Sequence, residues 1–252
     1  HHFTTDDSAR VIIFLLSGVA AGMVAKQIRD GVSSSLKEAE RRHKVENLFG
    51  QQISAEVAEK ILESNGEIET RRMKVAVMFI DIRNFTNFAA ESSPEEVVKY
   101  QNAFFGIVIN AVTKHEGVVH QFLGDGCMIT FGAPVSLDNP SERAVNTAYE
   151  ILRQLERAGM EGTIKPTRIG IGIHTGEAVT GNIGTSVRQQ YSVTGTVVIT
   201  AARIEQLNKK YESVLLVSED VVRNIDGHPA AKHLGEQQLK GLPGSLSVYK
   251  LV

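Results

Sequence analysis

The feature that most restricts how this chain can fold is an apolar run at residues 75–80 followed directly by Asp81-Ile82-Arg83-Asn84-Phe85-Thr86. A short run rich in β-branched side chains is typical of a buried strand, and the residues after it are typical of a turn and a helix start. The pattern therefore predicts that Asp81 lies at the C-terminal edge of a buried strand. A lone aspartate there is also common as a helix N-cap or a turn residue, so a functional interpretation needs a second observation.

That second observation is Gly124-Asp125-Gly126, which lies between two apolar runs within residues 118–132. A glycine-containing turn between two such runs predicts a β-hairpin with Asp125 at its tip. Two carboxylates at strand ends, with main-chain carbonyl groups beside them, offer oxygen ligands suited to Mg²⁺ or Mn²⁺ and a triphosphate. Taken alone, the hairpin would be an ordinary turn.

The sequence Phe79-Ile80-Asp81-Ile82-Arg83, continued by Phe85-Thr86, is followed about forty residues later by Phe122-Leu123-Gly124-Asp125-Gly126. In this order and spacing, the two segments strongly resemble the catalytic domain of class III adenylate and guanylate cyclases. The resemblance continues through residues 170–184 and through Ala201-Ala202-Arg203-Ile204-Glu205, and it ends near Lys240-Gly241. We therefore expect a nucleotidyl cyclase catalytic domain over residues 70–252.

The order of strand-like and helix-like segments predicts an α+β fold. A helix start at Ser93-Pro94 and helices over about 140–157 and 197–208 alternate with strand-like runs and the hairpin. This order predicts a ferredoxin-like α/β sandwich, with helices covering one face of a sheet that contains antiparallel strands. The resemblance implies the same class III nucleotidyl cyclase fold.

Composition limits the partners and the compartment. The chain has 252 residues and a formal net charge of −2, which gives no electrostatic footprint for nucleic acid. A nucleotide would then be held by metal ions and a few cations. Cys127 is the one cysteine, which excludes an intrachain disulfide framework and agrees with a reducing compartment and a buried, inert thiol.

The N-terminal part predicts a membrane anchor. Residues 1–10 form a tail in which His1-His2 is interpreted as a tag remnant, and residues 11–26 contain an uncharged run that we interpret as a transmembrane helix. The basic residues that follow it place the C-terminal side in the cytoplasm. A buried soluble helix is the alternative, because about fifteen residues of helix span only about 22 Å.

Residues 27–66 are interpreted as a signalling helix and linker. Apolar side chains at steps of three or four within residues 28–43 favour a parallel two-helix coiled coil that joins the membrane to the enzyme. An amphipathic helix lying on its own domain is the alternative, since Gly31 and the serines at 33–35 weaken a coil.

The resemblance also implies the metal and phosphate ligands. Class III cyclases form a 3′,5′-cyclic nucleotide by in-line attack of the ribose 3′-oxygen on the α-phosphorus, releasing pyrophosphate with the help of two Mg²⁺ or Mn²⁺ ions per site. On this resemblance Asp81, Asp125 and the carbonyl of Ile82 hold both metals. Main-chain amides around Phe85 and Thr86, with Gly124, contact the substrate phosphates.

Three cations receive roles from the resemblance. Arg203 matches the arginine that meets the transition-state charge at the α-phosphate, whereas its alternative role is a surface ion pair with Glu205 or a neighbour. Lys240 matches a lysine that binds the triphosphate, and Arg188 would contribute similarly from the loop after residue 184. A Lys-Gly turn and a solvated loop arginine are also ordinary surface features.

Three positions depart from the family pattern. On this resemblance, Gln121 and Ser192 occupy the pair of positions that reads the base. Each side chain can both donate and accept a hydrogen bond, so the pair discriminates poorly between bases. Adenine is favoured, and guanine and pyrimidines stay open. Ile199 occupies the position of an asparagine that orients the ribose. Loss of one such transition-state contact costs about 3–4 kcal/mol. Thr196 and Thr200 are the nearby hydroxyl groups considered as replacements.

The sequence therefore predicts a membrane-anchored adenylate cyclase that converts ATP to cyclic AMP in a homodimer with composite active sites. The alternatives are a cyclase for GTP or a pyrimidine nucleotide, and a catalytically weakened, cyclase-like nucleotide-binding module for signalling. A diguanylate cyclase is disfavoured because the chain has no Gly-Gly-acidic-Glu/Asp-Phe run.

Overall fold

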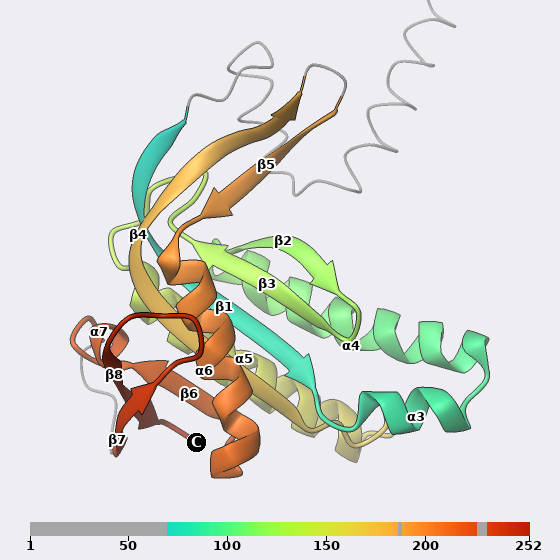
Figure 1. Ribbon diagram of the computed structural model, residues 1–252. Helices are drawn as coiled ribbons and strands as arrows, with labels where there is room; N and C mark the ends of the chain where they lie inside the picture. The colour runs from blue at the N-terminus through green and yellow to red at the C-terminus, as the bar shows by residue number, and fades with distance from the viewer. Residues whose placement is uncertain (1–69, 186–187, 226–230) are drawn as a thin grey trace, which may run out of the picture. The chain divides into compact units, whose positions relative to one another are not determined.

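The computed structural model describes residues 70–185, 188–225 and 231–252 (Figure 1). In chain order the elements are β1 (Arg71–Ile82), α3 (Phe85–Glu91), α4 (Pro94–Lys114), β2 (Val118–Leu123), β3 (Gly126–Phe131), α5 (Pro140–Met160), β4 (Ile169–Thr185), β5 (Arg188–Thr194), α6 (Thr196–Tyr211), β6 (Leu215–Ser218), α7 (Glu219–Val222), β7 (Lys232–Gln238) and β8 (Ser245–Lys250).

The strands form one eight-stranded sheet in the order β2-β3-β1-β4-β6-β8-β7, with β5 paired to β4. β1 lies between β3 and β4 and is antiparallel to both. The series β1-α4-β2-β3-α5-β4 has the ferredoxin-like strand and helix order, so the predicted α+β class is confirmed. The predicted hairpin is β2–β3, and Gly124 and Asp125 form its turn.

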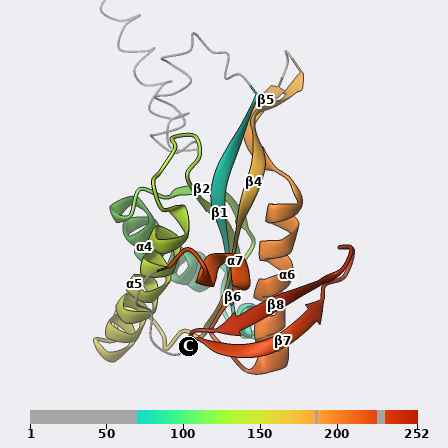
Figure 2. The ribbon, with the colours of Figure 1, turned by 90° about the vertical axis from the view of Figure 1, so that its left-hand side faces the viewer.

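Both faces of the sheet are buried. Along β1, Ala76, Met78 and Ile80 belong to the core that contains residues of α4 and α5, whereas Val75 and Val77 belong to a second core that contains residues of α6. Figure 2 shows α4 and α5 on one side of the sheet and α6 on the other. The prediction that the helices cover one face is therefore wrong. The continuous apolar run of β1 fits this arrangement, because a strand buried on both faces does not need to alternate with polar residues.

The helix starts follow the predicted signals. At α4, the Ser93 hydroxyl accepts a hydrogen bond from the Glu96 amide, and the Glu96 carboxylate accepts one from the Ser93 amide, which forms a capping box. At α5, the Asn139 side chain accepts from the Glu142 amide. The ends differ from the predictions, because α5 continues to Met160 and α6 extends over 196–211. Cys127 is fully buried as predicted, and burial raises the pKa of its thiol to about 12.

The prediction of a membrane-anchored protein with a cytoplasmic catalytic domain is corrected. Among residues 70–185, 188–225 and 231–252, no helix is long and apolar enough to cross a membrane. The segments behind that prediction, 11–26 and the linker at 27–66, lie outside the described residues, as does the tail at 1–10.

Candidate active site

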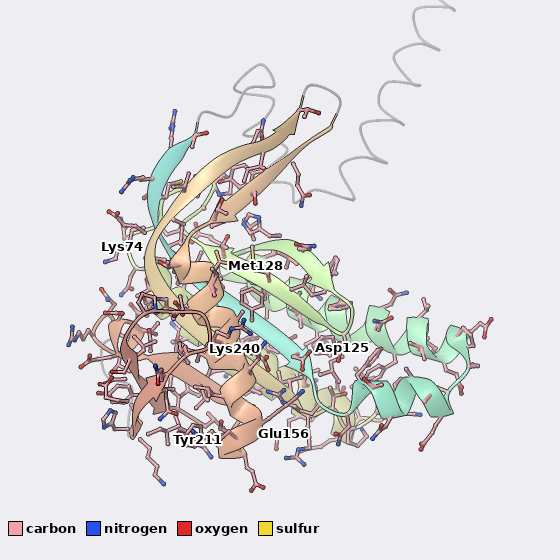
Figure 3. The ribbon with its side chains drawn as sticks, in the orientation of Figure 1. Lys74, Asp125, Met128, Glu156, Tyr211 and Lys240 are labelled. Carbon is pink, nitrogen blue, oxygen red and sulfur yellow. The ribbon has the colours of Figure 1, made fainter. Side chains whose placement is uncertain are left out.

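Asp81 and Asp125 meet at one end of the sheet. Asp81 is the next-to-last residue of β1 and lies opposite Gly126 of β3, which directly follows Asp125. A Cβ atom added at Gly126 would lie 2.3 Å from the carbonyl oxygen of Ile80, so this close approach requires glycine. Figure 3 shows Asp125 at the tip of the β2–β3 hairpin, beside the end of β1. The structure thus brings together the two carboxylates on which the sequence interpretation depends.

The electrostatics of this edge fit a divalent cation. Burial raises the pKa of the Asp81 carboxyl, the negative charge of Asp125 raises it further, and the positive charge of Arg83 opposes both. A carboxylate whose ionisation is opposed by burial and by a neighbouring negative charge is stabilised when a cation binds beside it.

The donor set fits Mg²⁺ or Mn²⁺ with few protein ligands. Within the described parts of the chain, no group of three or more His, Cys, Asp or Glu side chains is placed to hold a metal ion. Two carboxylates and the main-chain carbonyl of Ile82, the last residue of β1, are the protein ligands that the resemblance assigns. Mg²⁺ sites in nucleotide enzymes commonly combine one or two carboxylates with water and substrate phosphates, which agrees with this small set.

The predicted phosphate-binding segment follows β1 directly. α3 begins at Phe85 after Asn84, whose backbone is left-handed (φ 60°) and whose side chain makes no cap hydrogen bond. Phe85 packs against the ring of Tyr100 on α4, with 6.4 Å between the ring centroids, and Thr86 is exposed. On the hairpin side, the carbonyl of Gly124 accepts a hydrogen bond of 2.9 Å from the Gln101 side chain. α4 therefore contacts both segments that flank the acids.

Arg203 of α6 and Lys240 lie together in the structure. The Arg203 Nε donates to the carbonyl oxygen of Lys240 at 3.2 Å, and its Nη1 donates to the Gln206 side chain at 2.9 Å. Figure 3 shows Lys240 beside α6. The alternative role considered for Arg203, an ion pair with Glu205, is not what this geometry favours, because Glu205 pairs with Arg83.

Ile199 lies one turn before Arg203 on the exposed side of α6, and 47% of its surface is accessible. The Thr200 hydroxyl donates to the carbonyl of Thr196 at 2.8 Å, and Thr200 is buried. A hydroxyl already bonded to its own helix backbone is a poor replacement for the missing asparagine amide.

The two positions predicted to read the base lie on strands that a ring contact holds near each other. Gln121 is an exposed residue of β2 that directly follows a bulge, and Ser192 lies on β5 opposite Gly181. The residues just before them, His120 and Tyr191, stack with 5.7 Å between their rings. Nothing in the sequence pattern predicted this pair.

Arg188 differs from its prediction. It is the first residue of β5 and pairs with Thr185, so it belongs to a strand and not to a loop after residue 184. Its side chain is outside what the structure describes.

Two charged residues missed by the sequence interpretation complete the site. The guanidinium of Arg83 lies 3.3 Å from the Asp81 carboxylate and 2.6 Å from the Glu205 carboxylate. Burial raises the pKa of Glu205, and the charge of Arg83 opposes that shift. A signal was available, since Glu205 lies on the buried face of α6 with Ala201 and Asn208, where a charged residue implies a buried partner.

The site residues form two separate groups in the described chain. One contains the acids and the start of α3, the other contains Arg203 and Lys240, and the Arg83–Glu205 ion pair connects Asp81 to α6. Across residues 70–185, 188–225 and 231–252, no hydrogen bond or ion pair joins Asp81 or Asp125 to Arg203 or Lys240.

Comparison with known proteins places these observations in a family. The model of the adenylate and guanylate cyclase catalytic domain matches residues 68–252. "Uncharacterized protein Rv1320c" of Mycobacterium tuberculosis (strain ATCC 25618 / H37Rv) is 33% identical over 211 residues, which cover 83% of this chain and 36% of the relative. "Uncharacterized protein Rv1319c" of the same strain is 33% identical over 196 residues, covering 78% of this chain and 36% of that protein. The chain thus spans about a third of the length of these relatives.

Solved structures agree in fold. The guanylyl cyclase Cya2 is 30% identical with a TM-score of 0.64, over 73% of this chain and 93% of that one. The adenylyl cyclase CyaB from P. aeruginosa is 29% identical with a TM-score of 0.64, over 73% and 96% of the two chains. A bacterial light-regulated adenylyl cyclase, 22% identical over 88% of this chain and 63% of that one, has a TM-score of 0.75 and supports the fold alone.

Proposed function

Because the chain belongs to the family of adenylate and guanylate cyclase catalytic domains, we propose that it converts ATP to 3′,5′-cyclic AMP and pyrophosphate as a homodimer. The observation that carries the proposal is the meeting of Asp81 and Asp125 at the end of β1, where burial and the negative charge of Asp125 raise the pKa of the Asp81 carboxyl. Such a pair is unfavourable without a cation and gives a nucleotide–metal complex its anchoring point.

On this proposal, the ribose 3′-oxygen bonds to the α-phosphorus while the bond from that phosphorus to the leaving oxygen breaks. The hydroxyl proton passes to solvent, and pyrophosphate takes the bonding electron pair. Two Mg²⁺ or Mn²⁺ ions held by Asp81, Asp125 and the Ile82 carbonyl would supply charge stabilisation to the attacking oxygen and the phosphates. The main-chain amides around Phe85 and Thr86, with Gly124, would orient the phosphates.

Arg203 is proposed to stabilise negative charge at the α-phosphate, and Lys240 to bind the outer phosphates. Support comes from their proximity, since Arg203 donates to the Lys240 carbonyl. That hydrogen bond leaves the Lys240 ammonium for another partner and keeps both residues together beside the middle of α6. Arg188 keeps its proposed triphosphate contact as an expectation.

The active site is proposed to be shared between two chains. Within one chain, the acids make no direct contact with Arg203 or Lys240 among the described residues. In a twofold dimer, the acids of one subunit would face the Gln121, Ser192 and Arg203 of its partner, and two composite sites would result.

Adenine is the proposed base, read by Gln121 and Ser192. Both side chains can donate and accept, so a cyclase acting on GTP or a pyrimidine triphosphate is the second candidate. Adenylyl and guanylyl cyclases both occur among the similar solved structures, which supports a cyclase but not one base.

A weakened cyclase that serves as a nucleotide-binding signalling module is a third candidate, and one observation favours it. Ile199 presents an exposed hydrocarbon side chain one turn before Arg203, where the family has an amide.

The deciding experiment is incubation of the protein with each of ATP, GTP, CTP and UTP in the presence of Mn²⁺, with products identified by mass spectrometry. Cyclic AMP as the main product would support the proposal. A different cyclic nucleotide would replace the base assignment, and nucleotide binding without any cyclic product would favour the signalling module.

A further inference from the structure

A partly buried charge triad includes Asp81 of the proposed metal site. The Arg83 guanidinium contacts Asp81 at 3.3 Å through Nη1 and Glu205 at 2.6 Å through Nη2. The side chains of Arg83 and Glu205 are only 13% and 10% exposed, whereas that of Asp81 is 31% exposed. The shorter and more buried contact of the Arg83 guanidinium is therefore the one to Glu205, and its contact with Asp81 is the weaker of the two.

The fold fixes Arg83 in this position from several directions. Its amide donates to the Arg168 carbonyl at 2.8 Å, and Nη2 lies 3.5 Å from the main-chain oxygen of Glu205. A Cβ atom added at Gly170 of β4 would lie 1.5 Å from Nη2, so the guanidinium fits only because this strand position has no side chain.

The choice of partner matters because Arg83 and a metal ion compete for the same carboxylate. A guanidinium fully paired with Asp81 would neutralise the ligand and occupy its lone pairs. Glu205 of α6 offers the guanidinium a second anion, at the shorter distance. In the observed geometry, the Arg83 guanidinium orients the Asp81 carboxylate without pairing fully with it.

We propose that Glu205 is a positioning residue that holds the Arg83 guanidinium away from full pairing with Asp81, and so keeps Asp81 available for a divalent metal ion. This inference rests on the metal assignment of the proposed function. On this proposal, a residue of α6 affects metal binding by an acid on β1 of the same chain. Glu205 itself acts only through Arg83.

The test compares Glu205→Gln, Arg83→Gln and the double variant. In Glu205→Gln the guanidinium has only Asp81 as a carboxylate partner, so Mn²⁺ binding should weaken about tenfold, as a change of 1.4 kcal/mol produces. In Arg83→Gln the competing cation is gone, so Mn²⁺ should bind at least as tightly as in the unmodified protein. The double variant should regain the affinity that Glu205→Gln loses.

Mn²⁺ binding is measured directly from the free-Mn²⁺ signal in electron paramagnetic resonance, with 3′-deoxy-ATP present so that no turnover occurs. Thermal unfolding of each variant is recorded alongside, and binding is measured where all variants are folded. Arg83→Gln leaves a buried carboxylate unpaired and should be the least stable variant. Stability and metal affinity should therefore rank the variants differently, which a purely structural role of the pair would not produce.

Two controls separate this inference from the proposed function. Glu161→Gln makes the same chemical change in an exposed ion pair with Arg157 on α5, and should leave Mn²⁺ binding unchanged. Asp81→Ala should abolish the measured Mn²⁺ site, and if it does not, the metal assignment itself fails. If Asp81→Ala removes the site but Glu205→Gln binds Mn²⁺ as well as the unmodified protein, or Arg83→Gln binds it less well, the role given to Glu205 is wrong.

Discussion

The Asp81 carboxylate is proposed to bind metal, and its ionisation lowers the stability of the folded state. Its carboxyl pKa is raised by burial and by Asp125, so ionisation is less favourable in the folded than in the unfolded chain. In the window above the ordinary aspartate pKa, the folded state binds more protons than the unfolded state, and stability falls as pH rises. The negative charge that the proposed metal site needs therefore comes at some expense of stability.

We therefore expect Asp81→Asn to abolish cyclic nucleotide formation while raising the unfolding temperature at neutral pH in the presence of a chelator. Asp125→Asn should also abolish turnover. Asp138→Asn, which lies beyond the opposite end of β3, is the control and should change neither property. Product formation by either site variant at the unmodified rate would contradict the metal assignment.

His120 makes a separate contribution to pH dependence. Burial lowers its pKa to about 4, and its Nε2 lies 2.6 Å from the Thr130 hydroxyl. Between pH 4 and the ordinary histidine pKa of about 6.5, the unfolded chain binds the extra proton, so stability should rise with pH by up to about 3 kcal/mol. His120→Phe keeps a ring against Tyr191 and should flatten this rise in chemical denaturation. The rise should not vanish, because burial also lowers the pKa of His174.

Ile199 is expected to limit the rate. Ile199→Asn places a donor one turn before Arg203, and a tenfold gain in kcat needs only about 1.4 kcal/mol of added transition-state stabilisation. Ile109→Asn changes an exposed isoleucine on α4 in the same way and should not alter kcat. If kcat of a folded Ile199→Asn protein does not rise, another group already orients the ribose or the site does not serve turnover.

Among single residues, the sequence could predict those whose neighbours along the chain form a recognisable pattern. Asp81 ends an apolar run in a buried strand, and Asp125 lies between two glycines of a hairpin, so the positions of both could be predicted. Glu205 and Arg83 are 122 residues apart in sequence, and their contact depends on how β1 and α6 pack. No local pattern specifies which buried cation a buried carboxylate will meet.

Among the elements, helix starts were more predictable than helix positions. Ser93 and Glu96 predict the start of α4, because a capping box depends only on residues that are close in sequence. The face of the sheet on which α6 packs could not be predicted from local sequence. Because β1 is apolar on both faces, a helix could pack on either face. The small residues that let α6 approach the sheet, such as Ala201, become meaningful only when the second core is known.

Removal of the α4 cap gives a test at this scale. Ser93→Ala loses the hydroxyl that accepts from the Glu96 amide and should cost about 1 kcal/mol of unfolding free energy. Cyclic nucleotide formation per folded molecule should stay unchanged, because the cap lies at the far end of α4 from the helix end that leads into β2. A loss of more than about 2 kcal/mol would exceed what this cap can supply.

For the whole molecule, the shared active site predicts complementation. Asp81→Ala and Arg203→Ala proteins should each be nearly inactive, whereas a mixed dimer places both defects in one site and leaves the other intact. With random exchange about half of the dimers are mixed, so activity should recover to about a quarter of the unmodified level. The measurement is product formation after subunit exchange, with exchange confirmed by native mass spectrometry.

Mixing Asp81→Ala with Asp125→Ala is the matched control, because each subunit then lacks one acid of its own half-site and every site is defective. No recovery is expected from that mixture. Complete exchange of the first pair without recovery would mean that each chain carries a complete site, and the shared mechanism would be abandoned.

The two-sided burial of β1 also limits how this enzyme can change over evolutionary time. Side chains along a strand point alternately to its two faces, so one inserted or deleted residue within β1 would exchange the contents of both cores and move the carboxylate of Asp81 to the opposite face. Stability and catalysis would be lost in the same event. Variation in this family member should therefore occur by substitution along β1 and by length changes only in the connections, because the packing of the hydrophobic core fixes the position of the Asp81 carboxylate.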